Sequence, residues 1–284
     1  MGVEPTAKRR RRRISASPPR VSAKQTAESV VAAANAQRDV LRLVPERLRR
    51  LEGALPGARP DAELAGYCVS TMPEPLRRWA FDLTKRNMRD AYERTWGWDN
   101  REKRRELSHS DARFLVAHAE KKHPTVERYG SETVARRDDE DDERRSELLS
   151  LASDDAVAFV HVRFEVEADD APVVYVYELQ CDAEKDARRK GLGRFLMRAA
   201  EAAGSSAGCE RSVLTVLKEN TGARAFYEKL GYVPDPDTPA DASCAYVILR
   251  KTLNTKIDRT PHNAFSRIYG ATFVSASWAT VSAP

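Results

Sequence analysis

The sequence has little that would indicate a metal site, a disulfide framework or a membrane span. None of its four cysteines forms a Cys-x-x-Cys pair, and its five histidines have no zinc-binding spacing. We therefore expect no bound metal and histidines that are solvated at the surface. The sequence has no long apolar run and no signal-peptide pattern, so we expect no membrane association and a reduced intracellular compartment. Because Gly-x-Gly-x-x-Gly and Gly-Lys-Ser/Thr are both missing, neither a dinucleotide fingerprint nor a nucleoside triphosphate loop is predicted.

Charge is distributed unevenly along the chain. The first 50 residues hold 13 basic and 4 acidic side chains, whereas the 284-residue chain as a whole has a formal charge of only +5. Residues 1–25, with Lys8 and the arginine run 9–13, are predicted to be a disordered basic arm that acts as a nuclear address, with a plain solvated tail as the alternative. The remaining body is mildly acidic, so we expect no direct nucleic-acid binding by it.

Three further parts follow the arm. Residues 26–64 predict an N-terminal helical segment and a connector, 65–252 a single α/β domain, and 253–284 a C-terminal tail without a usable pattern. An acidic insertion over 120–155 interrupts the domain and is expected to be a disordered or helical surface excursion. Alternation and β-branched runs predict strands over residues 113–118, 156–167, 173–180, 211–217 and 245–249.

A glycine loop between a strand and a helix is the most informative feature. The run from Val173 to Gln180 predicts a buried strand, and Arg188-x-x-Gly191-x-Gly193 then opens a helix for which Gly204 is the expected stop. Glycines allow the backbone to turn sharply, and the N–H groups of a helix N-terminus attract a pyrophosphate. An ordinary glycine turn is the alternative for this motif alone.

The order of elements and two motifs together resemble the GNAT superfamily of N-acetyltransferases. The first motif is Arg188-x-x-Gly191-x-Gly193, and the second is Asn220 followed by Ala223, Phe226, Tyr227 and Gly231. Within the superfamily, residues 65–252 resemble the N-terminal acetyltransferase D (NatD) family. The matching stretches are Trp79 to Met88, Trp96-Gly-Trp98, Arg101-Glu-Lys-Arg104, Ala158-Phe159, Arg163-Phe164, Tyr175-x-Tyr177-Glu178-x-Gln180, Arg188 to Gly193, Leu214-Thr-Val216 and Tyr246-x-Ile248-Leu249.

This sequence departs from the family pattern at three places. Position 165 is Glu where the family has Asp, the loop before Arg188 is longer, and the insertion after His118 is unusually long. The first departure bears on the distance to a substrate.

The resemblance implies a GNAT fold, an α/β structure with a mixed central sheet, flanking helices and a splayed strand pair at the acetyl-CoA site. It implies transfer of acetyl from acetyl-CoA to the free N-terminal amine of histones H4 and H2-A, without a metal, in nucleus and cytoplasm. We also expect a monomer. The alternatives are a GNAT enzyme for lysine or a small amine, and a non-catalytic chromatin-binding protein.

The resemblance also implies the site residues. Glu178 would be the general base, with Tyr177 beside it, and Tyr227 would be either a general acid or a core residue. The coenzyme would contact Gln180, Cys181, Asp182, Arg188, Arg189, Lys190, Gly191, Leu192, Gly193, Arg194, Phe195 and Asn220, with the pyrophosphate on the N–H groups of 190–195. The peptide groove would be lined by Tyr92, Trp96, Glu165, Tyr175, Tyr177, Thr215 and Tyr246.

The strand period conflicts with this assignment. Side chains alternate between the faces of a strand, so Tyr175 and Tyr177 share one face and Glu178 should point to the other. A splay or bulge would reconcile the roles of Tyr177 and Glu178, and a salt bridge on the sheet face is the alternative for Glu178.

Overall fold

The computed structural model describes residues 22–51, 62–119, 154–185, 187–241 and 243–253. Most of the predicted basic arm, the middle of the connector, nearly all of the acidic insertion and the tail from 254 lie outside these ranges.

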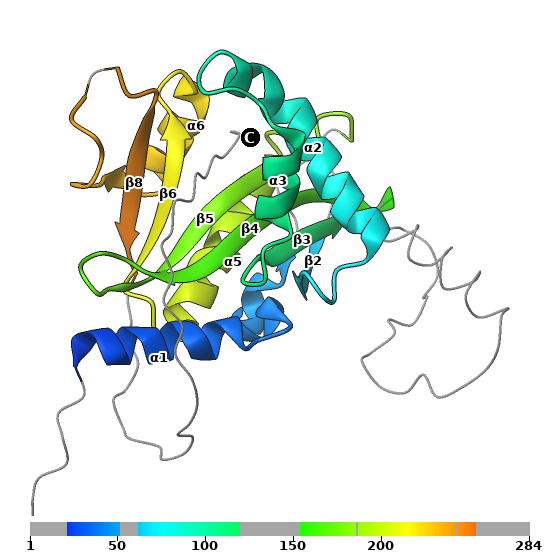
Figure 1. The fold of residues 1–284 in the computed structure, drawn as a ribbon. Helices are drawn as coiled ribbons and strands as arrows, with labels where there is room; N and C mark the ends of the chain where they lie inside the picture. The colour runs from blue at the N-terminus through cyan, green and yellow to red at the C-terminus, as the bar shows by residue number, and fades with distance from the viewer. Residues whose placement is uncertain (1–21, 52–61, 120–153, 186, 242, 254–284) are drawn as a thin grey trace, which may run out of the picture.

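Eight strands form one mixed sheet in the order β1-β2-β3-β4-β5-β6-β8-β7 (Figure 1). Neighbouring strands are antiparallel except β5 and β6, which are parallel. The five predicted strands are confirmed as β3, β4, β5, β6 and β8. The bounds are β1 Arg50–Leu51, β2 Ala62–Cys68, β3 Arg113–Ala119, β4 Ala156–Val166, β5 Pro172–Cys181, β6 Arg211–Leu217, β7 Val233–Pro234 and β8 Tyr246–Thr252.

Helices cover both faces of the sheet, as expected for the predicted fold class (Figure 1). One face carries α2 (Glu74–Glu93) and α3 (Asn100–Leu107), and the other carries α1 (Ala23–Asn35) and α5 (Leu192–Ala207). The short helix α6 (Thr221–Lys229) packs into the α5 side, and the single turns η1 (Val40–Leu43) and η2 (Glu46–Leu48) follow α1. No helix within the described ranges is long and apolar enough to cross a membrane.

Each face of the sheet has its own apolar core. The stripe of α2 buries Leu76, Ala80 and Leu83 against aromatic side chains of β3 and β4. Helix α5 buries a stripe that includes Leu196 and Ala200 in a larger core on the opposite face. The helical period predicts both stripes, because residues three and four apart lie on one side of a helix.

Three elements in the N-terminal half of the chain differ from the predictions. Helix α1 begins at Ala23, inside the predicted disordered arm, because the side chains of Ser22 and Gln25 form a reciprocal capping box. Its residues Ala27 and Ala34 are buried, so the N-terminal segment is part of the same body as the sheet. Strand β2 lies partly in the predicted connector, and α3 is a helix that no apolar pattern revealed.

The predicted end of α5 is also wrong. The helix continues past Gly204 to Ala207 and ends at Gly208, whose φ of 93° is in the left-handed region. A Cβ at Gly204 would lie 2.4 Å from Cγ1 of Val174. Gly204 therefore allows close packing of the helix on β5, and it does not terminate the helix.

Strands β5 and β6 separate after four paired positions. They pair from Val173 with Arg211 to Val176 with Leu214, whereas β5 continues to Cys181 and β6 to Leu217. This register confirms the expected splayed pair. The second half of β5 therefore continues past the paired register with β6.

We predict that Gly66→Ala lowers the stability of the protein. An added Cβ on β2 would lie 2.3 Å from Oδ1 of Asp39 and 2.5 Å from the backbone nitrogen of Leu41, both at the start of η1. Overpacking of this kind costs about 1–3 kcal/mol. Chemical denaturation should show the loss. Glu63→Ala on the same strand removes a partly exposed ion pair with Arg50 and adds no atom, so it should cost below about 1 kcal/mol. Equal losses in both variants would contradict the close approach.

Candidate active site

A bulge in β5 brings the predicted base to the face of the predicted groove. Val162 pairs with Val176 and His161 pairs with Glu178, so Tyr177 is an extra residue on β5. The extra residue shifts the alternation of the strand by one position. Tyr177 and Glu178 therefore face the same side, and the conflict in the sequence prediction is resolved by the bulge.

Contacts on the two faces confirm this arrangement. Val174, Val176, Leu179 and Cys181 all belong to the core on the α5 side. On the opposite side, Glu178 contacts α3 and Gln180 contacts α2.

Glu178 is held by an ammonium group that is itself buried. Lys103 Nζ from α3 lies 2.8 Å from Glu178 Oε1 and 2.7 Å from Glu106 Oε1. Glu178 is 0% exposed and Lys103 is 7% exposed. One ammonium thus neutralises only one of two buried carboxylates, and an uncompensated buried charge is unfavourable. Glu178 and Glu106 together therefore bind an additional proton more readily than exposed carboxylates do.

The pKa values in this cluster follow from burial and charge. Burial raises the pKa of Glu178 to about 7, although Lys103 and the amide of Gln180 work in the opposite direction. Burial also raises the pKa of Glu106. The pKa of Lys103 is raised because the nearby carboxylates outweigh its own desolvation. A carboxylate with a pKa near neutrality is suited to accept a proton at physiological pH.

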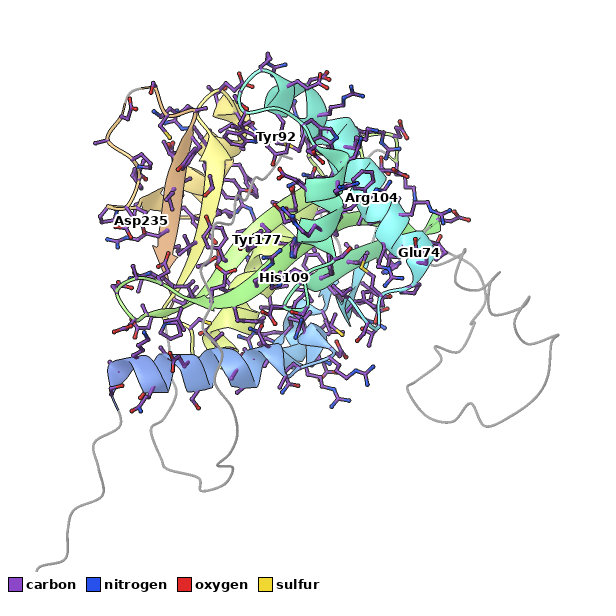
Figure 2. All side chains as sticks on the ribbon, viewed as in Figure 1. Glu74, Tyr92, Arg104, His109, Tyr177 and Asp235 are labelled. Carbon is purple, nitrogen blue, oxygen red and sulfur yellow. The ribbon has the colours of Figure 1, made fainter. Side chains whose placement is uncertain are left out.

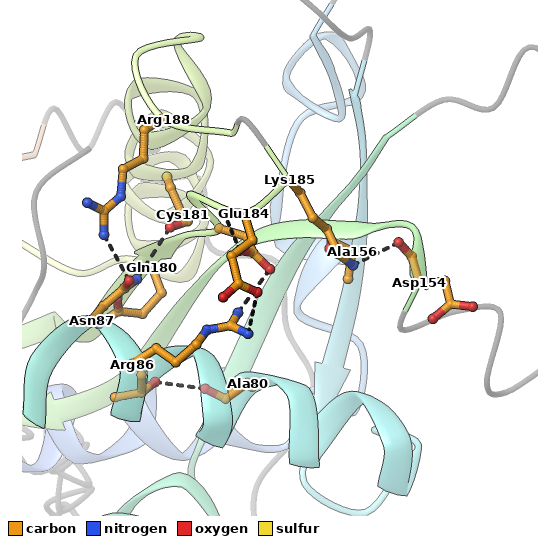
Figure 3. A network of polar contacts seen from close by, with 12 residues as sticks. Ala80, Arg86, Asn87, Asp154, Ala156, Gln180, Cys181, Glu184, Lys185 and Arg188 are labelled. Carbon is orange, nitrogen blue, oxygen red and sulfur yellow. Dashed lines mark hydrogen bonds and ion pairs between the residues drawn. The ribbon is translucent and has the colours of Figure 1, made fainter.

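A chain of amides leads from Glu178 to the glycine loop. Gln180 Nε2 donates to Glu178 Oε2 at 2.7 Å, and Asn87 Nδ2 donates to Gln180 Oε1 at 2.9 Å. Arg188 Nη2 then donates to Asn87 Oδ1 at 2.8 Å. Figure 3 shows Asn87 on α2 between Gln180 and Arg188.

Two tyrosines of β5 form the floor of the region between α3 and β6. Tyr177 donates to Glu165 Oε1 at 2.6 Å, and the hydroxyls of Tyr175 and Thr215 are 2.6 Å apart. The two tyrosine rings are 5.1 Å apart, and Arg163 stacks on Tyr177 at 4.1 Å. Figure 2 shows Tyr177 near the middle of the sheet. The structure thus brings Glu165, Tyr175, Tyr177 and Thr215 together as predicted.

An aromatic group stands above this floor. Trp96 is 41% exposed and lies 5.3 Å from the ring of Tyr92 and 6.1 Å from that of Tyr246 on β8. Trp96 is therefore at the surface, as its predicted role in substrate binding requires. Tyr92 is buried, stacked on Trp98 at 5.6 Å, with Lys103 over its ring at 5.2 Å. Of the three predicted aromatic residues, Trp96 and Tyr246 are thus accessible, while Tyr92 is buried beneath Trp96.

Tyr227 lies in the core of the opposite face. Its side chain is fully buried, and its hydroxyl has no hydrogen-bond partner among the described residues. Burial raises its pKa well above the usual value, and the groups that raise it further include Cys181 and Glu178. The hydroxyl therefore keeps its proton at neutral pH, close to the end of β5.

The glycine loop forms an open, positively charged helix start. Gly191 is the N-cap of α5 with a φ of 84°, and an added Cβ there would meet no described atom within 4 Å. Arg188, Arg189 and Arg194 around it are exposed. Backbone N–H groups at such a start favour an anion, and the arginines add to that field.

Comparison with known proteins identifies the family. The sequence profile described as Acetyltransferase (GNAT) family matches residues 87–232, more than half of the chain. The chain belongs to the GNAT acetyltransferase family. It is an acetyltransferase that uses acetyl-CoA as donor.

Solved structures of other acetyltransferases resemble this GNAT protein at low identity. PaiA N-acetyltransferase from Thermoplasma acidophilum, in complex with coenzyme A, is 15% identical over 67% of this chain and 98% of that chain, with a TM-score of 0.42. Arabidopsis thaliana NAA60, in complex with a bisubstrate analogue, is 11% identical over 68% and 99%, with a TM-score of 0.39. The Escherichia coli ribosomal-protein-S18-alanine N-acetyltransferase is 14% identical over 71% and 99%, with a TM-score of 0.40.

The residues of the GNAT loop fit a pyrophosphate, with corrections to the predicted contacts. The N–H of Phe195 already donates to Gly191 O at 2.9 Å, and its side chain is buried, so Phe195 does not belong to the cradle. The thiol of Cys181 points into the core and the carboxylate of Asp182 pairs with Arg86. The N–H of Asp182 donates to Val157 O and its carbonyl accepts from the N–H of Ala187, both at 2.9 Å, so Asp182 does not fit the predicted coenzyme contact. The leading N–H groups that remain for the anion belong to Leu192, Gly193 and Arg194.

Asn220, predicted to contact the coenzyme, also has a structural role. Its Oδ1 accepts from the N–H of Ala223 at 3.1 Å and caps α6.

Lys190, another residue predicted to contact the coenzyme, is half-buried at the start of the glycine loop. No cluster of three or more potential metal ligands occurs among the described residues.

Sequence reasoning missed three functional side chains. Lys103 was hidden in a charged run without an apolar pattern, and Asn87 had no signal beyond its place in a matching stretch. His161 was expected at the surface, but it is fully buried between the rings of Phe114 and Tyr177 at 4.8 and 5.1 Å. Burial lowers its pKa well below the usual value, so it is neutral beside the positive charges of Arg163 and Lys103.

We predict that Lys103→Met destabilises the acetyltransferase in a pH-dependent way. Removing the ammonium leaves Glu178 and Glu106 buried without it, which costs about 3–5 kcal/mol when they are charged. When folding raises the pKa of a carboxyl, the free energy of unfolding falls as the pH rises from the pKa of the unfolded state, near 4.3, to the pKa of the folded state. Since Glu178 already has a folded pKa of about 7, the deficit of the variant should widen above that pH, by about 1.4 kcal/mol per pH unit.

Denaturation at about pH 6 and about pH 9 measures this difference. The matched control is Arg105→Met on the same helix, because Arg105 is exposed and pairs only weakly with Glu102; its effect should be small and independent of pH. A deficit in Lys103→Met that does not change between the two pH values would show that the ammonium does not hold these carboxylates.

Proposed function

We propose that this GNAT protein is a protein N-alpha-acetyltransferase that acetylates the free N-terminal amine of histones H4 and H2-A. The observation that carries the proposal is the β5 bulge, which sets Glu178 and Tyr177 on one face at the point where β5 and β6 separate. The arginine run of residues 9–13 supports a nuclear as well as a cytoplasmic location.

Glu178 has the properties of a general base for an α-amine. An α-amine has a reference pKa of about 8, so it must lose a proton before it can attack. A carboxylate with a pKa near 7 differs little from the amine in proton affinity and accepts that proton directly or through a water. Once Glu178 has taken up the proton it is neutral, and Lys103 remains paired with Glu106. The protonated form of Glu178 is therefore stable in the buried site.

Glu165 supports a basic N-terminus as the substrate. It lies on β4 and accepts a hydrogen bond from the hydroxyl of Tyr177. A carboxylate at this place would attract an arginine such as the third residue of Ser-Gly-Arg-Gly. The aromatic side chains of Trp96 and Tyr246 would contact the residues before it.

The donor would bind at the start of α5 and along the part of β5 that continues past its register with β6. When bound, acetyl-CoA supplies the acetyl group as a thioester. The backbone of Gln180 and Cys181 would hold its amide-bearing arm, and the loop from Arg188 to Arg194 its pyrophosphate. Tyr227, with its unpartnered and protonated hydroxyl near the end of β5, is positioned to protonate the departing thiolate.

The substrate class is tested with two forms of one peptide. A histone H4 N-terminal peptide with a free α-amine should be acetylated in the presence of acetyl-CoA, whereas the same peptide with a blocked N-terminus and free lysines should not. Mass spectrometry of the products locates the acetyl group. Equal acetylation of the blocked peptide would replace the proposal by a lysine acetyltransferase, and no acetyl transfer to either form would remove histones as substrates.

We predict that Glu178→Gln lowers kcat by about 10²–10⁴-fold, the usual contribution of a positioned base. The amide has the same shape but accepts no proton at neutral pH. Acetyl-CoA affinity, measured by calorimetry, should change by less than about threefold because Glu178 is not part of the phosphate loop.

Glu102→Gln on α3 is the matched control, since it removes an exposed carboxylate that pairs with Arg105. Unchanged turnover in Glu178→Gln would remove Glu178 as the base and leave the family assignment intact.

A further inference from the structure

An unbroken hydrogen-bond path joins the glycine loop to the proposed base. It runs from Arg188 through Asn87 and Gln180 to Glu178, with donor–acceptor distances of 2.8, 2.9 and 2.7 Å. Its members come from the loop before α5, from α2 and from β5, so the path joins three parts of the fold. None of the steps described above requires Asn87.

The two ends of the path fix its direction. A guanidinium has only donors, and an ionised carboxylate has only acceptors. Asn87 must therefore turn its oxygen to Arg188 and its nitrogen to Gln180, and Gln180 must turn its nitrogen to Glu178. A reversed amide at either position would place two donors, or two acceptors, against each other.

The path starts at a residue that a coenzyme would engage. Arg188 is exposed beside the open N-terminus of α5, where a phosphate would attract its guanidinium more strongly than a neutral amide does. Asn87 would then lose the donor to its Oδ1 and keep only the contacts of its Nδ2, with Gln180 Oε1 at 2.9 Å and with the Cys181 carbonyl at 3.3 Å. The hydrogen bond from Gln180 to Glu178 at the other end would weaken with it.

We propose that Asn87 is a positioning residue through which occupancy of the coenzyme loop controls the carboxylate of Glu178. This inference rests on the proposed role of Glu178 as base. Loading of the donor releases the base from a hydrogen bond that stabilises its charged form, so the base becomes a stronger proton acceptor when acetyl-CoA is in place. The second substrate then meets an activated base only in the loaded enzyme.

Other charged and titratable groups face Glu178 from each packed element. They are Lys103 and Glu106 on α3, Tyr92 on α2, His161 and Arg163 on β4, Tyr177 on β5 and Tyr227 on α6. The pKa of Lys103, Tyr92 and Tyr227 is raised and that of His161 is lowered well below neutrality, so these groups keep one charge state near pH 7. Glu106 is the other carboxylate on Lys103, and a variant must distinguish it from Glu178.

The test is the pH dependence of coenzyme binding. The probe is 3′-dephospho-coenzyme A, because the 3′-phosphate of coenzyme A titrates near neutrality itself. A higher pKa of Glu178 in the bound state means that binding takes up a proton, so affinity must fall as pH rises. For a shift of about one unit, calorimetry should show a fall of about tenfold between about pH 6 and about pH 9.

Three variants locate the coupling. Asn87→Leu breaks the path and Glu178→Gln removes the titrating group, so the affinity of both should vary by less than about twofold over the same range. Arg86→Met is the matched control: Arg86 is one residue before Asn87 and pairs with Asp182 and Glu184 without touching the path. It should keep the wild-type slope whatever its absolute affinity. Thermal unfolding shows that each variant is folded.

A flat profile in the wild type, or a wild-type slope in Asn87→Leu, would overturn the proposal. A slope that persists in Glu178→Gln would assign the proton to another group, such as Glu106, and overturn it as well. These measurements use no acceptor peptide. Failure to acetylate histone peptides would therefore contradict the proposed function without affecting this result, and a flat profile in an active enzyme would contradict only the coupling.

Discussion

The extra residue at Tyr177 is the constraint on which the site depends. With regular alternation, Glu178 would enter the apolar core beneath α5, where an unpaired carboxylate is costly. The bulge places it instead opposite Lys103. The same shift keeps Leu179 and Cys181 in the core, so the strand gains a polar face for the site without exposing its apolar one. The parallel pairing of β5 with β6 ends just before the bulge, at Val176.

The buried charge cluster explains why α3 is a helix in spite of its composition. Only Leu107 and the stem of Lys103 are buried on α3, so apolar burial alone would stabilise such a short helix weakly. Asp99 caps its N-terminus through Oδ1, and Lys103 attaches it to β5. The ammonium is therefore a structural and an electrostatic element at once. A buried ion pair gives little net stability compared with apolar packing, so stability alone does not explain its presence here, whereas the proposed role of Glu178 as base would.

The parts of the fold that were predictable are those whose signal is local. β-branched runs identified five strands, the Asn220 cap and Gly231 marked α6, and the glycine loop marked the start of α5. The bulge could not be predicted, because it depends on register with His161 and Val162 of another strand. Lys103 and Glu178 are separated by 75 positions, and no local pattern connects them. Gly204 misled the prediction because its role is close packing on Val174, which sequence alone does not distinguish from a helix stop.

The proposed function assigns one strand to two substrates. The first half of β5 is paired with both β4 and β6 and carries Tyr175 and Tyr177, whereas its second half continues past the register with β6 and carries the backbone proposed to hold the donor. Glu178 and Gln180 lie at the change between the two halves. In the proposed reaction, a group at that point stands between the acceptor amine on one side and the donor arm on the other. Because Asn87 and Lys103 approach it from α2 and α3, both helices of that face contact the junction. The position of the proposed base therefore follows from where the parallel pairing ends.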